Sequence, residues 1–282
     1  MKLTQLWNPK VLLDFPLYAP LRQVIQRLGR VEFPNLADWN SLLLSHYPGI
    51  TVKSGLPLHF VGQEQGKLGF ESQYEPRCYL SGEVQTREKN WHDLFNAMVW
   101  LSFPKSKAAI NSRHYDALQG AAKLAVQDKG ASQRGKVRDM ATLLDESGVI
   151  VACAEEELAE LLCNFKWKEL FWQRRAQLKA GMDFYVFGHG LYEKALDPYI
   201  GMTGQGLVIM VERKFFNWPL LERLVWLDQC VASYLNAPEH CISTKELHPV
   251  PLLGMPGWTV MNESESFYDN TAYFRPGRGR AL

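Results

Sequence analysis

The chain has 282 residues, of which 46% are hydrophobic, 12% aromatic and 22% charged, and its formal net charge is +1. This length suits one large domain or two small ones, and the apolar fraction is sufficient for a sizeable core. The balanced charge favours no polyanion over the chain as a whole. No apolar run approaches the roughly 18 residues of a membrane span, so we expect no membrane partner.

The five cysteines and the first residues bear on the cellular compartment. No cysteine pair has the CxxC spacing of redox or metal motifs, and the total is odd, so we expect reduced thiols. The first seven residues lead into Asn8 and Pro9 rather than into the apolar stretch of a secretory signal. We therefore expect a cytoplasmic protein.

The first 50 residues predict a helical arm packed on the core. Apolar residues recur at helical spacing in 17–28, with Pro20 placed to start a helix, and again in 35–46. We expect two units of organisation within one globular body. These are the arm, residues 1–50, and a main α+β domain, residues 51–282.

After the arm, the helical pattern gives way to short strand-like segments. These lead to residues 87–111, which contain the main candidate site. Short strands are expected at 58–61 and 67–70, around a glycine-rich turn, and residues 74–84 are expected to be extended. Within 87–111, an apolar helix ends near Pro104, and a second, alanine-rich helix is expected to follow.

The clearest secondary-structure prediction is a β-hairpin over residues 139–153. Residues 139–145 form its first strand, Glu146-Ser-Gly148 its turn, and the apolar run from Val149 to Cys153 its second strand. Residues 127–138 have the composition of a loop.

The remaining segments alternate between helix and strand patterns. We expect helices at 155–179, 191–196 and 218–235, and strands at 181–187 and 206–211. The last 45 residues, rich in Pro, Gly and aromatics, lack a regular pattern and should drape over the core. The sum predicts an α+β fold with a small, mostly antiparallel sheet, packed helices and a long C-terminal wrap.

A polar stripe interrupts the apolar helix within residues 87–111. His92, Asp93 and Asn96 are spaced to share one helical face. Buried polar groups cost about 1–3 kcal/mol each when unsatisfied, so they need partners or a ligand. His92 could act as a base or metal ligand, and Trp100 beside the amide would suit a planar ligand. Alternatively, Asn90 caps the helix and Asp93 serves its first turn.

Two further histidines are candidates for the same cleft. His189 lies between two glycines that would let the backbone approach a ligand closely, or it is incidental to a turn that starts a helix. His114 follows Asn111 by three residues and could face the cleft, or it is an ordinary surface histidine.

Acids at the ends of the expected hairpin strand could complete a site. Asp139, Asp145 and Glu146 could join His92 or His189 in a divalent metal site or an acid/base pair. The HExxH and DxDxD spacings of common metal sites are absent, and the acids of a hairpin turn have a structural use of their own. A divalent metal therefore stays a possibility, and the cofactor is unknown.

One segment has a marked charge asymmetry. Residues 105–138 carry eight basic side chains against two acidic ones, which suits a polyanion-binding surface. The basic residues are Lys105, Lys107, Arg113, Lys123, Lys129, Arg134, Lys136 and Arg138.

Several motifs together resemble a known family. They are Asn90-Trp-His-Asp-Leu-Phe-Asn-Ala97, Phe103-Pro-Lys105, Asp145-Glu-Ser-Gly148, Gly188-His189, Leu253-Gly-Met-Pro-Gly-Trp258 and Phe274-Arg-Pro276. Their order and spacing resemble an uncharacterised bacterial family known as domain of unknown function 3025, over roughly residues 55–276. The resemblance implies a single bacterial cytoplasmic domain and draws attention to these positions, but it implies no substrate.

Two functions follow as hypotheses. The first is an enzyme, a hydrolase or transferase acting on a polar or phosphate-bearing small molecule, with His92, Asp93, Asp145 and His189 as catalytic residues. Substrate would be bound by Arg87, Asn96, Trp100, Asn111, His114 and Arg138, the arginines clamping an anion through bidentate geometry. The second is a non-catalytic module that binds RNA or another polyanion through residues 105–138. The first requires the histidines and acids to converge in one cavity, and the second requires an exposed basic face.

Overall fold

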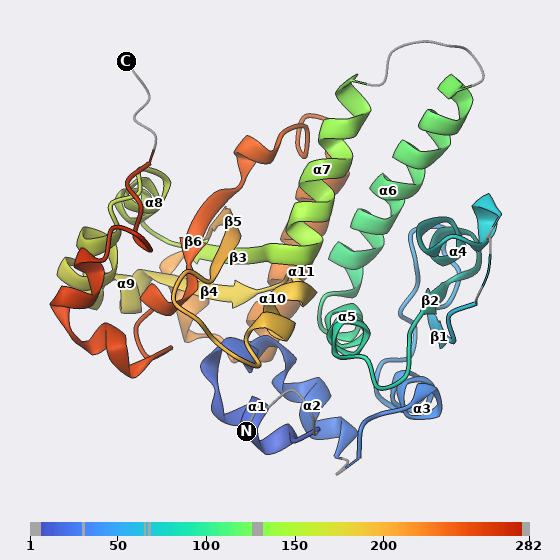
Figure 1. The fold of residues 1–282 in the computed structure, drawn as a ribbon, viewed down its shortest axis with the longest axis horizontal. Coiled ribbons are helices and arrows are strands. Elements are labelled where there is room, and N and C mark those ends of the chain that lie inside the picture. The colour runs from blue at the N-terminus through green and yellow to red at the C-terminus, as the bar shows by residue number, and fades with distance from the viewer. Residues whose placement is uncertain (1–6, 30–31, 65, 67–68, 126–131, 278–282) are drawn as a thin grey trace.

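The computed structural model describes residues 7–29, 32–64, 66, 69–125 and 132–277, but not the side chains of 121–138. It confirms the α+β class: a four-stranded sheet and a two-stranded sheet are surrounded by helices (Figure 1). None of the helices in these ranges combines the length and hydrophobicity needed to cross a bilayer.

The larger sheet is mixed and has the order β4-β3-β5-β6. The central strand β3 (Gly148–Cys153) is buried at every residue. It runs antiparallel to β4 (Met182–Val186) and parallel to β5 (Thr203–Met210), and β6 (His248–Pro251) pairs antiparallel with β5. An apolar run of this kind is typical of a strand covered on both faces.

The predicted hairpin over 139–153 is wrong in its first half. Residues 139–147 belong to helix α7 (Ser132–Ser147), which also includes residues 132–138 of the expected loop; Lys129 and its neighbours lie outside the described residues. Met140, Ala141 and Leu144 are buried, and this spacing is a helical stripe rather than an alternating strand. Gly148 joins the helix to β3 directly, and a Cβ there would lie 2.2 Å from the carbonyl oxygen of Leu144.

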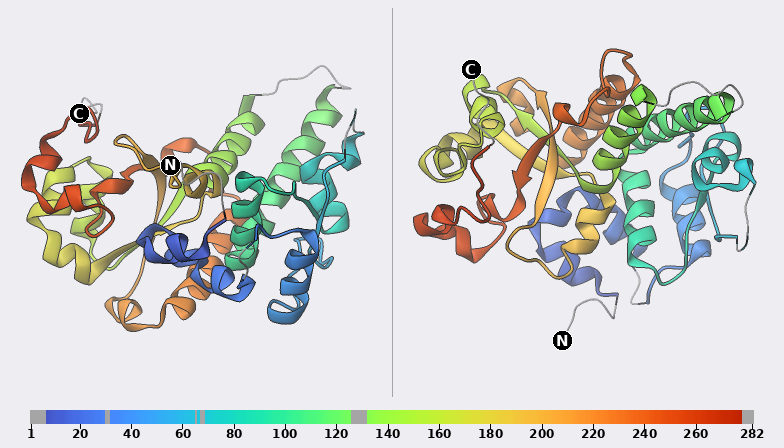
Figure 2. Two further views of the ribbon diagram at one scale, coloured as in Figure 1. Left: turned by 60° about the horizontal axis from the view of Figure 1, so that its bottom comes forward. Right: turned by 45° about the horizontal axis from the view of Figure 1, so that its top comes forward.

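Two long helices follow the apolar helix α5 (Trp91–Ser102). Helix α6 (Pro104–Ala125) packs along α7, and the pair extends away from the sheets (Figures 1 and 2). The start of α6 is capped from α11 (Leu220–Asn236), because the buried carboxylate of Asp228 accepts the N–H groups of Lys105 and Ser106.

The small sheet lies in the region expected to be strand-rich. Strand β1 (His59–Val61) confirms the expected strand at 58–61 and pairs in parallel with β2 (Glu83–Gln85). Residues 74–84 are mostly not extended, because α4 (Tyr74–Ser81) fills them, ending at Gly82 with positive φ. Of the strand expected at 67–70, residues 67 and 68 lie outside the described part, and Phe70–Ser72 form a 3-10 turn.

The N-terminal segment packs against α5 and α10 (His189–Lys194). Its elements are α1 (Pro9–Asp14), a 3-10 turn (Pro16–Leu21), α2 (Arg22–Leu28) and α3 (Leu36–His46). The ring of Tyr18 stacks on both Phe95 of α5 and Tyr192 of α10, each at 5.7 Å between centroids. This aromatic cluster holds α5 against α10.

The C-terminal half wraps around the far end of the large sheet. Helix α8 (Glu156–Cys163), a π-turn (Glu169–Gln173) and α9 (Arg175–Gly181) connect β3 to β4. The last 45 residues contain strand β6, which the sequence pattern missed, followed by 3-10 turns. Tyr268, Tyr273 and Phe274 are buried in the wrap.

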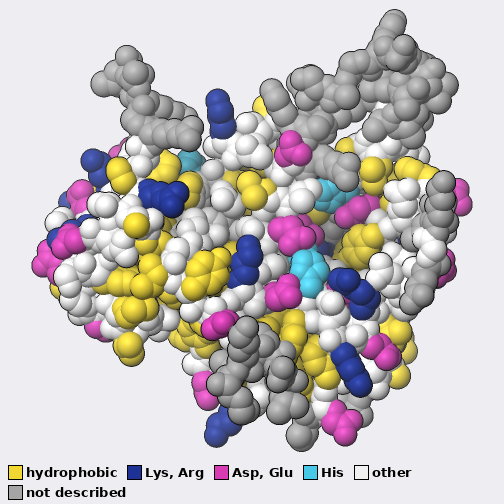
Figure 3. Space-filling model, in the orientation of Figure 1, with side chains coloured by type: hydrophobic (Ala, Val, Ile, Leu, Met, Phe, Trp, Pro, Cys, Tyr) yellow, Lys and Arg dark blue, Asp and Glu magenta, His cyan; other side chains and the backbone are white. Residues whose placement is uncertain are grey.

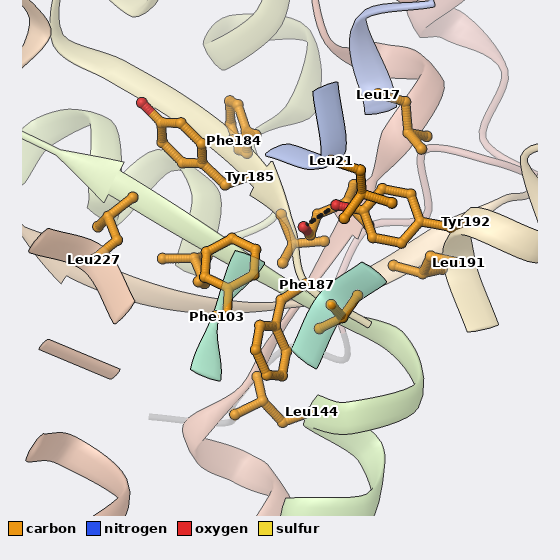
Figure 4. Close-up of a cluster of buried hydrophobic side chains, with 14 of the residues drawn as sticks. Leu17, Leu21, Phe103, Leu144, Phe184, Tyr185, Phe187, Leu191, Tyr192 and Leu227 are labelled. Carbon is orange, nitrogen blue, oxygen red and sulfur yellow. Dashed lines mark hydrogen bonds between the residues drawn. The ribbon is translucent and has the colours of Figure 1, made fainter. Parts of the chain in front are cut away.

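The hydrophobic core joins the helices to the sheet. Figure 4 shows Leu144 of α7, Phe103 after α5, and Phe187 after β4 packed together. The rings of Phe103 and Phe187 meet edge to face at 5.4 Å. The ends of α7, α5 and β4 are therefore fixed by the core, and the candidate site is built on these ends.

Candidate functional site

The antiparallel pairing of β3 with β4 brings two distant segments together. Val149 pairs with Val186, so the residues before β3 lie beside those after β4. The Gly188 N–H donates to the carbonyl oxygen of Gly148 at 2.9 Å. Glu146, at the end of α7, thereby lies next to His189, the first residue of α10. Helix α5 packs against α10 and adds His92 from its own first turn.

The glycines on either side of His189 permit a close approach of protein backbone. A Cβ at Gly188 would lie 2.4 Å from the nitrogen of Gly148 and 2.5 Å from that of Ser147. One at Gly190 would lie 2.8 Å from Glu146 Oε2. Among the described residues, the nearest atoms to both glycines belong to the end of α7 and the start of β3. Because the glycines have no side chains, α10 can pack directly against this segment.

Gly188→Ala is expected to destabilise the protein by about 1–3 kcal/mol, because the new methyl group meets backbone atoms that cannot move independently. Urea unfolding followed by circular dichroism measures the change. Gly69→Ala is the matched control, since no atom of the described residues lies within 4 Å of the position that a Cβ would take there and its φ is negative. Equal stability of the two variants would contradict the tight junction of α10 with α7.

Three ligand atoms converge where these segments meet. His92 Nε2 lies 2.9 Å from His189 Nε2 and 3.8 Å from Glu146 Oε1, and His189 Nε2 lies 3.5 Å from the same oxygen. The point equidistant from the three atoms is therefore about 2.0 Å from each, within the range of zinc–nitrogen and zinc–carboxylate bonds. Among the described residues, His92, Glu146 and His189 form a group whose ligand atoms are close enough to hold a metal ion.

Both imidazoles have a carboxylate on the side away from the convergence point. His92 Nδ1 lies 3.1 Å from Glu193 Oε2. His189 Nδ1, which has no hydrogen-bond partner, lies 3.7 Å from Asp145 Oδ2. A carboxylate at Nδ1 favours a proton on that nitrogen and leaves the Nε2 lone pair available to a metal. His92 has the carboxylate–histidine pair that is common among metal ligands, whereas the carboxylate beside His189 lies beyond hydrogen-bond distance.

Charge and burial keep the site in a suitable protonation state. Burial lowers the pKa of His189 to about 4, so this imidazole is neutral at pH 7. Burial alone would raise the pKa of Asp145, but attraction to Lys107 and His189 outweighs it, and the pKa is lowered. Burial raises the pKa of Glu146, against the effect of His92. Neutral imidazole is the form that binds metals.

Lys107 supplies the buried positive charge beneath the site. It is 3% exposed, pairs with Asp145 Oδ1, and lies over the Trp100 ring at 5.6 Å. Asp145 therefore faces Lys107 with one oxygen and His189 with the other, which fixes its orientation.

The structure confirms the capping role of Asn90 but gives the Asp93 carboxylate a different partner from the one expected. Asn90 caps α5, since its side chain accepts the Asp93 N–H at 3.0 Å. The Asp93 carboxylate instead accepts from the Arg87 backbone and from Nε and Nη2 of its guanidinium, at 2.7, 2.9 and 2.8 Å. Burial raises the pKa of Asp93, but the Arg87 hydrogen bonds outweigh it and lower the pKa. Arg87 thus has two of its donors occupied by Asp93.

A polar cavity of about 300 Å³ adjoins the three ligand atoms. The four residues predicted to be catalytic all line it, together with Arg87 and Asn96 of the predicted substrate-binding set. The described residues in the lining are Gln63, Tyr74, Glu75, Gln85, Arg87, His92, Asp93, Asn96, Asp145, Glu146 and His189. On the face shown in Figure 3, histidine side chains reach the surface beside acidic and basic ones.

The other predicted substrate-binding residues lie elsewhere. Trp100, Asn111 and His114 are buried and are not in this lining. Asn111 Nδ2 donates to the backbone oxygen of Glu75 at 3.0 Å, which joins α6 to α4 behind the cavity. The side chain of Arg138 lies outside the described part of the chain.

A second cavity, of about 370 Å³, lies between the N-terminal segment and the C-terminal wrap. Its lining is mainly apolar, including Phe15, Trp91 and Leu253, with Asn8 and Thr259 among its few polar residues. It contains no charged group among the described residues.

Sequence reasoning missed residues whose spacing carried a signal. Glu193 follows His189 by four positions, which puts both on one face of α10. Lys107 follows Phe103 by four positions and precedes Asn111 by four, which marks it as part of a buried face. Glu146 was recognised as a possible metal ligand but assigned to a hairpin turn. Tyr74 and Gln85 had no distinctive spacing.

The basic segment contributes to packing where it is described. Lys105 Nζ donates to Gln229 Oε1 at 2.6 Å, and Lys107 is buried. Arg113 donates to the carbonyl oxygens of Leu235 and Ala237 at 2.5 and 2.6 Å, at the end of α11. The side chains of Lys123, Arg134 and Lys136 lie outside the described part.

Comparison with known proteins gives one match. A family model described as a protein of unknown function (DUF3025) matches residues 58–278. No curated protein and no solved structure is significantly similar to the chain.

Proposed function

The chain belongs to the DUF3025 family, and from the geometry of its cavity we propose that it is a metal-assisted enzyme, a hydrolase or a transferase that uses water or a hydroxyl group, acting on a polar small molecule. The ion is held by His92, Glu146 and His189. The observation that carries the proposal is the position about 2.0 Å from three converging ligand atoms, at a distance suited to zinc and similar divalent ions.

The three ligands leave room for reactants. Two imidazoles and one carboxylate would hold the ion, and positions on either side of the plane of their three ligand atoms would remain for water or substrate, as in catalytic sites. A divalent ion in this setting supplies a Lewis acid that activates water and polarises the bond to be broken. The cavity of about 300 Å³ has the size of a small-molecule site.

The protein residues around the ion have separate roles. Glu193 orients His92 through a hydrogen bond at Nδ1, and the Asp145 carboxylate lies 3.7 Å from His189 Nδ1 and acts on it electrostatically. Lys107 holds Asp145 ionised. Glu75 lines the cavity and is placed in α4, away from the ion ligands. Both Glu75 and Asp93 have protein partners, since Asn111 Nδ2 donates to Glu75 Oε2 at 2.5 Å and Asp93 pairs with Arg87. We assign proton transfer with the substrate to Glu75 because the partner of its carboxylate is an uncharged amide.

The cytoplasmic location stays part of the proposal. All five cysteines are free thiols in the structure, which is consistent with a reducing compartment. A polyanion-binding role receives no comparable support, because the described basic side chains of residues 105–113 contact protein groups.

An activity assay with and without metal tests the proposed function. Protein stripped with a chelator and reloaded with Zn²⁺, Mn²⁺ or Co²⁺ is assayed against panels of esters, amides and phosphoesters. We expect turnover that needs the ion and falls at least about 100-fold in Glu146→Gln. Glu160→Gln, a change on the remote helix α8, is expected to keep full activity. Turnover unaffected by metal removal or by Glu146→Gln would contradict the proposal.

A further inference from the structure

Uncharged hydrogen-bonding groups form much of the cavity lining beyond the ion ligands. Gln63, Gln85 and Asn96 contribute side-chain amides, and Tyr74 contributes a hydroxyl group. Burial raises the pKa of Tyr74 well above its ordinary value, so the hydroxyl stays protonated. The lining thus offers neutral donors and acceptors to a ligand.

Two of these amides have atoms without a hydrogen-bond partner among the residues that the structure describes. Gln85 is 6% exposed, and its Nε2 has no hydrogen-bond partner. Asn96 is 7% exposed, and its Oδ1 has none, although its Nδ2 donates to Tyr74 Oη at 2.8 Å. Buried polar atoms in folded proteins are nearly always satisfied. Both residues line the polar cavity, and a ligand there that supplies a carbonyl oxygen and an N–H group would satisfy the two atoms.

Without the ion, the protein charges around the cavity disfavour an anionic ligand group. Four carboxylates line it, from Glu75, Asp93, Asp145 and Glu146, against the single guanidinium of Arg87 among the described residues. That guanidinium is held by Asp93 through two hydrogen bonds. Lys107, the nearest buried amine, is occupied by Asp145. Phosphate recognition in proteins depends on cations that are free to contact the oxygens.

We propose that the cavity recognises its substrate through an uncharged amide-type edge, such as that of a carboxamide, ureide or lactam. Gln85 donates to the substrate carbonyl oxygen, and Asn96 accepts from the substrate N–H. This inference rests on the proposed function and specifies its substrate class. It replaces the phosphate-bearing substrate suggested by the arginines alone.

Matched small probes test the recognition directly. Binding of 2-pyrrolidinone, N-methyl-2-pyrrolidinone and inorganic phosphate is measured by NMR titration of the full chain, with the ion present and after chelation. We expect 2-pyrrolidinone to bind in both states and its N-methyl analogue to bind at least about tenfold more weakly, because Asn96 loses its donor partner. Phosphate is expected not to bind the chelated protein.

Variants of Gln85 test whether its amide donor binds the ligand. Gln85→Glu replaces the free donor by an acceptor, and it is expected to weaken 2-pyrrolidinone binding at least about tenfold while leaving metal affinity unchanged. Gln85→Met is the second variant, which removes the donor without adding charge. Gln173→Met, at an exposed position of the π-turn outside the cavity lining, is the control and is expected to leave 2-pyrrolidinone binding unchanged.

The possible results separate this inference from the proposed function. Equal binding of the two lactams, no lactam binding, or binding of phosphate alone to the chelated protein would overturn the inference. A protein that binds the lactam selectively but takes up no metal would retain the recognition and overturn the metal-assisted function. The comparison of the two lactams needs only the wild-type chain, so a variant that fails to fold does not remove the test.

Discussion

Replacing His92 by alanine or Glu146 by glutamine is expected to lower the affinity for Zn²⁺ at least about 100-fold, because each change removes one of three converging ligand atoms. The side chains of His92 and Glu146 are 33% and 45% exposed, so both variants should fold. Isothermal titration with Zn²⁺ after chelation measures the affinity, and circular dichroism checks the fold.

The matched control for this experiment is His46→Ala. His46 is exposed at the end of α3, and its side chain lies apart from the candidate site. We expect its removal to leave the affinity and the single-site stoichiometry unchanged. A similar loss of affinity in all three variants would indicate non-specific binding through surface histidines and would contradict the three-ligand centre.

Lys107→Met is expected to destabilise the protein by about 3–5 kcal/mol, because the Asp145 carboxylate would keep its charge without its buried partner. Lys107 is 3% exposed, and Asp145 accepts its hydrogen bond within the same buried region. Urea unfolding at pH 7 measures the free energy of unfolding. Lys179→Met, at an exposed position in α9, is expected to change it by less than about 0.5 kcal/mol.

The double variant Lys107→Met/Asp145→Leu distinguishes the ion pair from simple packing. Removing both charges leaves no buried carboxylate unpaired, so most of the lost stability should return. If the loss of stability in the double variant equals the sum of the losses in Lys107→Met and Asp145→Leu alone, the two residues do not interact and the assigned pairing is wrong.

The sequence was most informative where local chemistry decides the structure. The cap at Asn90 and the polar stripe of His92, Asp93 and Asn96 are read from spacing along one helix, and the structure has both features in α5. The strand at 181–187 followed by Gly188-His189 is equally local, and β4 and α10 occupy it.

Tertiary pairing could not be read from the sequence. Residues 139–147 fit a strand or a helix over so short a stretch, and packing of Met140 and Leu144 against the core decided for the helix. The partner of β3 is β4, 29 residues further on from Cys153 to Met182, and not the preceding segment. This pairing places Glu146 beside His189, so the centre depends on a contact that no local pattern encodes.

The partners of the charged residues were also set by tertiary contacts. Arg87 and Lys107 carry the positive charges that bind anions in many proteins, but here each forms an ion pair within the chain, with Asp93 and Asp145 respectively. Whether a basic side chain is free depends on which helix ends meet, which the sequence alone does not give. The charge of segment 105–138 suggested a binding surface. In the structure, Lys105, Lys107 and Arg113 instead contact protein groups that pack against α6.

The measurement that tests the metal centre most directly is anomalous X-ray diffraction from a crystal of the full chain grown with one equivalent of Zn²⁺. We expect one strong peak bonded to His92 Nε2, His189 Nε2 and Glu146 Oε1, with each bond about 2.0–2.2 Å long. A peak bound elsewhere, or no peak at this position in a crystal that contains zinc, would contradict the metal centre and with it the metal-assisted function.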